Sequence, residues 1–79
     1  MNTNLKIGCL YITNAVIAAH EPQIMRWISL SRKSVLLFLK EDKHEIGTNQ
    51  ITLTFLQGTR IIKHYVSIHN KNWYFEQLS

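Results

Sequence analysis

Cysteine is nearly absent from this sequence, since Cys9 is the single one among 79 residues. One thiol cannot form an internal disulfide, so the core must hold without a covalent cross-link, which fits a reducing compartment. No apolar run approaches the roughly 18 residues of a membrane span. The first residues also lack the basic start and the small-residue cleavage site of a signal peptide. We therefore expect a cytoplasmic protein with no membrane partner.

Glycine and proline are also scarce, with three residues and one residue respectively. Gly8, Gly47 and Gly58 stand far apart and none precedes an expected helix, so the sequence offers no phosphate-binding glycine loop. Adjacent carboxylates occur only at Glu41 and Asp42. The lysines on either side of this pair keep it ionised, which does not suit acid–base catalysis near neutral pH.

Cys9 and the four histidines are the remaining candidates for catalysis or metal binding. Cys9 lies in an apolar segment, where a thiol packs as a small hydrophobe and its thiolate is disfavoured. Zinc sites use closely spaced ligand pairs, often with several cysteines. Here His64 and His69 are five residues apart, while His20 and His44 lie in separate segments. We expect no enzymatic activity, no metal, no cofactor and no small-molecule substrate.

Apolar residues make up 46% of the chain and charged residues 18%, a composition typical of a folded domain. The length predicts a single domain over residues 1–79. In the last third, apolar and polar residues alternate over residues 51–55, 60–68 and 73–78, with turn signals at Gly58 and again before the last segment. This pattern predicts a three-stranded β-meander.

The alternation also predicts which side chains of the meander face the core. In its first strand the isoleucine, leucine and phenylalanine are expected to point inward, and Thr52 and Thr54 outward. In its second strand the face that carries His64 and the face that carries Tyr65 are both half apolar. The sequence therefore leaves the inward face of this strand open.

The first half of the chain predicts further strands. Residues 5–13 and 24–30 alternate well enough for strands, and residues 35–39 form a continuous apolar run that is typical of a buried strand. Between the first two segments, Asn14 can cap a short helix over residues 15–20. An irregular loop fits the same residues, so both alternatives stay open.

The segment after residue 33 is ambiguous between a strand and a helix. Residues 34–45 contain good helix formers and Ser34 can cap them, which would give an α+β domain. We favour the strand, because Gly47 and Asn49 follow soon after and the neighbouring segments read as strands. Residues 40–50 are then expected to form a charged, solvated loop.

Five or six short strands in so small a domain favour closure into a barrel, which protects the sheet edges. The layout resembles the small SH3-like barrel proteins of tailed bacteriophages in its Lys6-Ile7-Gly8 opening, long loop, LLFLKE strand end and ITLTF…NWYFEQL meander. The resemblance implies a mainly β, SH3-like antiparallel barrel and a non-enzymatic accessory protein that engages a host factor. It transfers no functional residue, because the group shares a shape and not a site.

Positive charge is in modest excess, with nine Lys and Arg against five acids and a net charge of +4. Such an excess favours anionic partners. Basic residues near aromatic ones form a candidate binding surface that could meet phosphates and stack on bases. An alternative is that the tryptophans belong to the core and the cations only solvate the surface. The candidate residues are Arg26, Trp27, Arg32, Lys33, Arg60, Lys63, Tyr65, Lys71 and Tyr74.

Apolar side chains are more numerous than a single small core can hide. Several of the expected strands are apolar on both faces, which predicts exposed apolar surface and hence a protein interface. We therefore favour an interaction module whose apolar surface, rimmed with basic residues, binds and modulates a partner protein or a second copy. The alternative is a basic nucleic-acid-binding barrel.

Overall fold

The computed structural model describes residues 5–43, 49–70 and 73–78, and the strands of these residues form one antiparallel sheet. Across the sheet the strand order is β3-β2-β6-β5-β4-β1-β7. The mainly β class is confirmed, with seven strands in the described residues in place of five or six. In chain order they are β1 (Leu10–Thr13), β2 (Ile17–Glu21), β3 (Arg26–Leu30), β4 (Val35–Lys43), β5 (Gln50–Gln57), β6 (Arg60–Ser67) and β7 (Phe75–Gln77).

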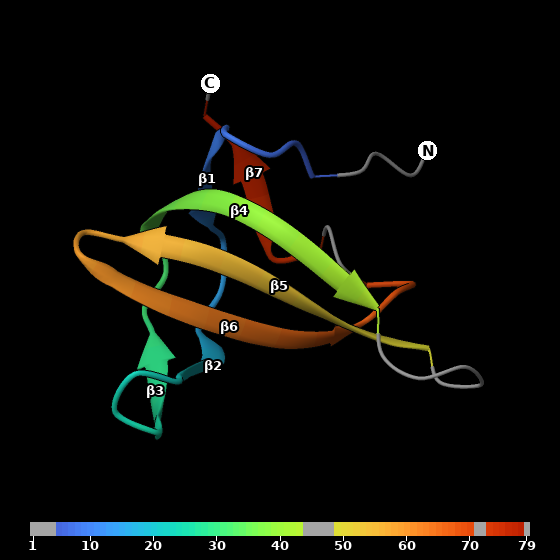
Figure 1. Ribbon diagram of the computed structural model, residues 1–79. Coiled ribbons are helices and arrows are strands. Elements are labelled where there is room, and N and C mark those ends of the chain that lie inside the picture. Colours follow the sequence, from blue (N-terminus) through green and yellow to red (C-terminus); the bar gives the residue numbers. More distant parts are fainter. Residues whose placement is uncertain (1–4, 44–48, 71–72, 79) are drawn as a thin grey trace.

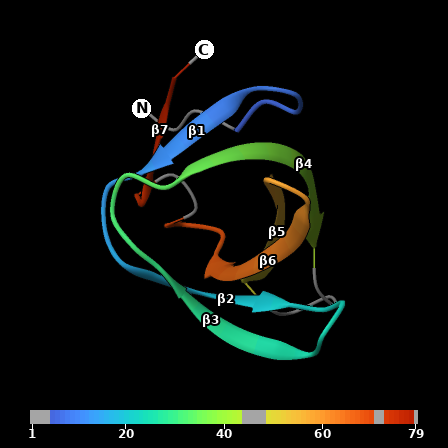
Figure 2. The same cartoon turned by 90° about the vertical axis from the view of Figure 1, so that its left-hand side faces the viewer.

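The sheet curls into a half-barrel whose wall is built by the long strands β4, β5 and β6 (Figure 1). Figure 2 shows β1 and β7 at one end of the curl and β2 and β3 at the other. The turn between β5 and β6 has Gly58 as its first residue, with φ of 63°. This left-handed conformation is the glycine position of the two-residue hairpin turns that match the twist of a sheet.

The core fills the concave side of the curl. Three phenylalanines form its centre: the ring centroids of Phe38 and Phe55 lie 5.4 Å apart, and those of Phe55 and Phe75 lie 4.9 Å apart. Burying each such side chain stabilises the fold by about 1.5–3 kcal/mol. The buried hydrophobic residues are Tyr11, Ile17, Ala19, Leu30, Leu36, Phe38, Ile51, Leu53, Phe55, Ile62, Val66 and Phe75.

The short helix over residues 15–20 is a wrong prediction, because residues 17–21 form strand β2. Ile17 and Ala19 are buried, whereas Ala18 between them is exposed, so this segment follows period two. The Asn14 amide donates to the Trp73 carbonyl at 3.0 Å and caps no helix. Tertiary pairing with β3 and β6 outweighs the local preference of two alanines for a helix.

The alternative helix over residues 34–45 is wrong as well, since β4 runs as a strand from Val35 to Lys43. The strand also extends into the segment that was expected to be a charged loop, and residues 40–43 pair with β5. A register shift between Phe38 and Lys40 interrupts the pairing. The remainder of that expected loop falls partly on residues 44–48, which lie outside the described residues.

Thr52 and Thr54 point outward as predicted, and both side chains are nevertheless buried. They lie on the convex face of β5, the middle strand of the sheet. Register places Thr54 between Lys40 and Lys63, whose long side chains can cover a short threonine. The inward face of β6 is also resolved: His64 points into the core between Ile62 and Val66.

Candidate binding surfaces

Five apolar residues line up on the convex face of the sheet, four of them on β1, β4, β5 and β6 and one directly after β7. Leu10 pairs with Leu37, Leu37 with Leu56, and Leu56 with Ile61. Leu78 directly follows β7 and donates its backbone N–H to the Leu10 carbonyl at 2.8 Å, so it extends the line past β1. Directly paired residues of antiparallel strands point to the same face. We call Leu78, Leu10, Leu37, Leu56 and Ile61 the apolar row.

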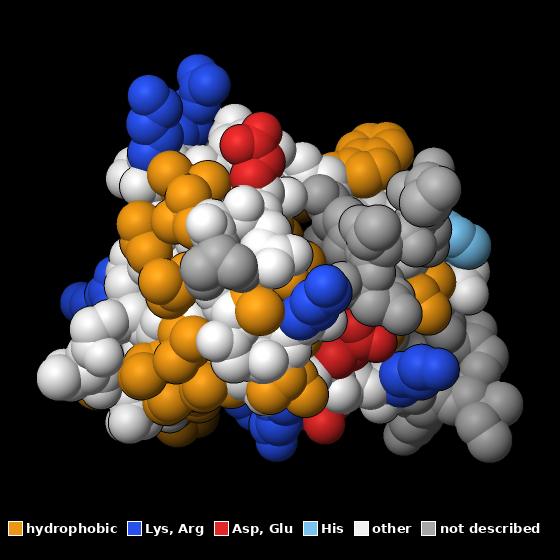
Figure 3. Space-filling model, turned by 90° about the horizontal axis from the view of Figure 1, so that it is seen from above, with side chains coloured by type: hydrophobic (Ala, Val, Ile, Leu, Met, Phe, Trp, Pro, Cys, Tyr) orange, Lys and Arg blue, Asp and Glu red, His pale blue; other side chains and the backbone are white. Residues whose placement is uncertain are grey.

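The apolar row is part of a wider apolar surface at one end of the molecule. Leu10 and Leu78 are exposed, and the other three residues of the row are half-buried. Val35 is exposed and pairs with Ile12 beside the row. Figure 3 looks down on the end where β1, β4 and β7 lie, and shows hydrophobic side chains gathered there with Lys or Arg side chains at their border. Such a surface is a candidate protein interface.

A second line of residues crosses the convex face nearer to β3. Trp27 pairs with His20, His20 with Lys63, Lys63 with Thr54, and Thr54 with Lys40. We call Trp27, His20, Lys63, Thr54 and Lys40 the aromatic–cationic row. It shares β4, β5 and β6 with the apolar row but carries a different chemistry, because two lysines and two aromatic rings replace the leucines.

Tyr65 lies beside the aromatic–cationic row and joins its rings into a cluster. The Trp27 ring centroid is 5.1 Å from that of His20 and 5.7 Å from that of Tyr65, with tilts of 53° and 52°. Next to Tyr65 the surface has a hollow of about 340 Å³. Its lining consists of Asp42, Lys43, Thr52, Lys63 and Tyr65.

The structure therefore brings together three of the residues predicted from sequence: Trp27, Lys63 and Tyr65. The alternative that Trp27 belongs to the core is wrong, because this side chain is 63% exposed. Trp73, which was given the same alternative, is 66% exposed. Two large aromatic side chains thus lie at the surface of a chain whose core is built from phenylalanine.

Arg26 and Arg60 are held elsewhere by a shared acid. The Glu21 Oε1 atom is buried and lies 3.6 Å from an Arg26 nitrogen and 3.5 Å from an Arg60 nitrogen. Arg60 also donates two hydrogen bonds to the Gln57 side chain, at 3.1 and 2.7 Å. The two guanidinium groups compensate the charge of a buried carboxylate, so we assign both arginines a structural role in the fold before any role in binding.

The other predicted site residues are scattered. Arg32 and Lys33 are exposed in the turn between β3 and β4, where Lys33 has a φ of 64° and donates its backbone N–H to the Thr13 carbonyl at 2.7 Å. Tyr74 packs against His64, away from Trp27. Lys71 lies outside the described residues.

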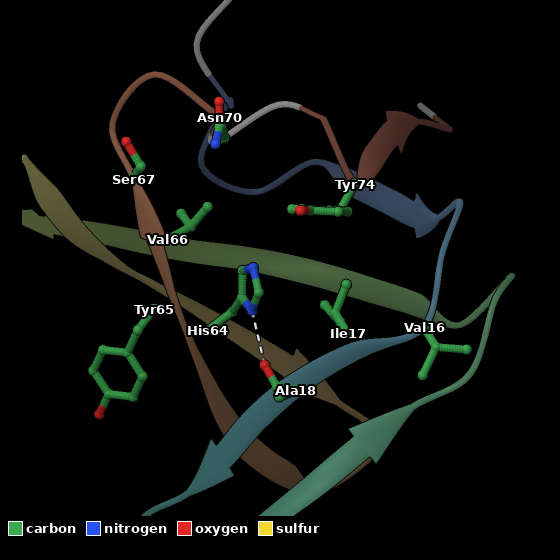
Figure 4. Close-up of a pocket in the computed structure, with 9 residues that line it drawn as sticks. All are labelled: Val16, Ile17, Ala18, His64, Tyr65, Val66, Ser67, Asn70 and Tyr74. Carbon is green, nitrogen blue, oxygen red and sulfur yellow. Dashed lines mark hydrogen bonds between the residues drawn. The ribbon is translucent and has the colours of Figure 1, made fainter.

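His64 borders a separate hollow of about 340 Å³ between β2 and β6 (Figure 4). Its Nδ1 lies 2.8 Å from the Ala18 carbonyl, so Nδ1 carries the proton and donates it. Nε2 is then an acceptor, buried and without a partner among the described side chains. Burial lowers the pKa of His64, against the opposing effect of the Ala18 hydrogen bond. A neutral imidazole is therefore the form that the fold selects.

Within the described ranges no group of three or more His, Cys, Asp or Glu side chains is arranged to hold a metal ion. Cys9 is half-buried in the turn that leads into β1. No helix in the described part of the chain is long and apolar enough to cross a bilayer.

Sequence reasoning missed His20 and both rows as assemblies. His20 was assigned to a helix or a loop, so its pairing with Trp27 was not expected. The available signal was the segment around Pro22, a turn residue that separates two segments with strand periodicity. The rows depend on which residues pair across the sheet, and alternation within one strand does not specify that.

Comparisons with protein-family models, with curated proteins and with solved structures found no match to this chain.

Proposed function

We propose that this chain is a non-enzymatic interaction module that binds another protein through the apolar row. The observation that carries the proposal is the position of the row, on the face of the sheet opposite the core. The concave face already has its own packed aromatic centre, so the leucines on the convex face add nothing to that core. Contiguous apolar surface of this kind is favourable to cover with a partner.

The charge of the chain favours an acidic partner over a second copy. Two copies would each carry a net charge of +4 over the whole chain and repel each other, whereas a negatively charged protein would be attracted. Arg32 and Lys33 are exposed and only Ser34 separates them from Val35, so cations lie close to the apolar surface. The partner of this proposal therefore presents an apolar patch with acidic residues around it.

The biological setting extends the same proposal. A curled antiparallel sheet is compatible with the SH3-like barrel class, and the strand layout resembles small barrel proteins of tailed bacteriophages. On that basis we propose a phage accessory protein that acts in the cytoplasm and modulates a host protein. The proposal transfers no site residue from that group, so its binding surface rests on the apolar row alone.

The test compares two exposed apolar positions, one inside the row and one outside it. Leu78 is 52% exposed and Ile24, in the turn before β3, is 55% exposed. Immobilised wild type, Leu78→Glu and Ile24→Glu are used to capture proteins from bacterial extract, and a captured acidic protein is purified and titrated by calorimetry. We expect it to bind wild type and Ile24→Glu equally, and Leu78→Glu about tenfold or more weakly, since one buried leucine contributes about 1.5–3 kcal/mol.

Two outcomes would contradict this proposal. One is a captured protein whose affinity falls equally in both variants, because binding would then not depend on the row. The other is self-association of the wild type that Leu78→Glu abolishes in sedimentation experiments, because the row would then hold a second copy. Circular dichroism of each variant establishes that the sheet is intact.

A further inference from the structure

Trp27 stands on an edge strand, with its ring at the surface and held by neighbours on one side. His20 and Tyr65 approach it at ring-centroid distances of 5.1 and 5.7 Å. These contacts fix the orientation of the indole, while most of its area remains in water. Trp73 is as exposed but has no aromatic neighbour in the described chain, which makes it an isolated surface residue. The Trp27 cluster is instead an oriented aromatic platform.

Lysines lie in register with this platform. Lys63 pairs directly with His20, and Lys40 follows two strands further along the same row. Lys40 forms an exposed ion pair with Asp42 at 3.4 Å, whereas no acid of the described residues forms an ion pair with Lys63. The ammonium group of Lys63 is thus available to an anionic ligand next to the rings.

The hollow beside Tyr65 adjoins the aromatic platform and adds a recess to this surface. Lys43 and Lys63 contribute cations to its lining, Tyr65 contributes a ring, and Thr52 and Asp42 contribute oxygen atoms. Asp42 repels phosphate, but its carboxylate can accept a hydrogen bond from an N–H group of a base, such as the ring N–H of thymine or uracil. The hollow has a volume of about 340 Å³, which lies within the range of small-ligand pockets and is large enough for a planar base.

Exposed rings beside lysines favour a ligand that carries planar faces and negative charge in each repeat. Single-stranded nucleic acid has both, because its unpaired bases stack on aromatic side chains and its phosphates meet cations. A duplex hides the faces of its bases, and an acidic protein lacks planar faces at regular intervals. We infer that the aromatic–cationic row, with Tyr65 and the adjoining hollow, is a binding surface for single-stranded nucleic acid. This surface is distinct from the apolar row and does not depend on the function proposed above.

The test is a titration of the full chain into fluorescently labelled oligothymidylate of about ten nucleotides, a length within the site sizes of single-strand-binding domains. Anisotropy is recorded at several salt concentrations. Trp27→Ala is expected to weaken binding about tenfold or more, since stacking of one base is worth about 1–3 kcal/mol. Trp73→Ala removes a tryptophan of matched exposure outside the row and is expected to bind as wild type does.

Lys63 is tested against a cation of the same charge elsewhere. Lys63→Gln is expected to weaken binding and to reduce the slope of log affinity against log salt by about 0.7. Arg32→Gln, in the turn between β3 and β4, is expected to leave both nearly unchanged. Trp27→Tyr keeps a stacking ring and is expected to retain most of the affinity, which guards against misreading a folding defect in Trp27→Ala.

Three results would overturn the inference. The first is absence of binding at low salt. The second is equal weakening by Trp27→Ala and Trp73→Ala. The third is a preference for duplex DNA or for polyglutamate over the single strand, because the surface would then bind negative charge without stacking on unpaired bases. Uridine and thymidine oligomers tested side by side distinguish RNA from DNA as the source of the same chemistry.

Discussion

The apolar row and the aromatic–cationic row both cross the convex face of the sheet, and they share β4, β5 and β6. On β5 they are only two residues apart, at Leu56 and Thr54. The chemistry of the surface therefore changes completely within one step along a strand. The comparison teaches that a small curled sheet can present two unrelated surfaces. Strand pairing places side chains of different strands next to one another, so each surface is defined by residues that pair across the sheet and not by residues that follow one another along a strand.

The register shift in β4 is what allows both rows to include this strand. Leu37 and Lys40 are three residues apart, which would place them on opposite faces of a regular strand. The register shift between Phe38 and Lys40 inserts one additional residue into β4. As a result Leu37 pairs with Leu56 and Lys40 pairs with Thr54, and both pairs point outward. Phe38 meanwhile keeps its place in the core.

The largest expected effect is a loss of stability that would disrupt both rows together. Phe55 is fully buried between the rings of Phe38 and Phe75, on the inner face of the strand that both rows share. Phe55→Ala is expected to lower the free energy of unfolding by about 3–5 kcal/mol, a large part of the stability of a small domain. Urea denaturation followed by circular dichroism measures it. A loss below about 1 kcal/mol would contradict the aromatic centre described here.

The second prediction concerns Arg26 and Arg60, which belong to neither row because both form ion pairs with Glu21. Glu21→Gln leaves Arg26 and Arg60 without their shared carboxylate, and a loss of about 1–2 kcal/mol is expected because both guanidinium groups are partly exposed. Asp42→Asn, which breaks the exposed pair with Lys40, is expected to change stability by less than about 0.5 kcal/mol.

These two variants are compared by the midpoint of thermal unfolding. Equal effects would contradict the distinction between a buried carboxylate that holds the fold and an exposed one on the surface. Oligonucleotide affinity serves as a second measurement, and we expect Glu21→Gln to leave it unchanged wherever the variant is folded.

Position 64 provides the third prediction, on the face opposite both rows. Burial lowers the pKa of His64 in the folded protein, so the unfolded chain takes up a proton near its ordinary value of 6.5 before the folded protein does. The free energy of unfolding is therefore unaffected by protonation of His64 above that pH. Below it, the free energy of unfolding falls by up to about 1.4 kcal/mol per pH unit because of this group.

The control is His64→Phe, which cannot titrate. Free energies of unfolding at pH 7.5 and at pH 5 are measured for both proteins, and we expect a steeper decline for wild type. Parallel declines would show that groups other than His64 account for the acid sensitivity, and would contradict the neutral state assigned to His64.

Period two predicted much of the fold, because apolar and polar residues alternate over residues 51–55 of β5 and burial alternates along β6. It failed at residues 17–21, where alanines and a capping asparagine favour a helix locally and only pairing with β3 and β6 imposes a strand. It also stopped β4 too early, since charged residues continue a strand when a partner such as β5 runs beside them.

The candidate surface was partly predictable for the same reason. Trp27, Lys63 and Tyr65 were identified by residue type, because rings next to cations have a known use. Their convergence was not predictable, since it requires the pairing of β2 with both β3 and β6. Arg26 was included as a cation next to Trp27 and Arg60 as a cation on the strand of Lys63, and only the structure shows that Glu21 holds both.

The central claim is that the convex face carries two surfaces with separate ligands, and the most direct measurement is an NMR titration of the labelled chain with oligothymidylate. We expect the indole N–H signal of Trp27 and the amide signals of His20, Lys63 and Tyr65 to shift together, while those of Trp73, Leu10 and Leu78 stay in place. Shifts centred on Leu10 and Leu78, or equal shifts of both indole signals, would contradict the account.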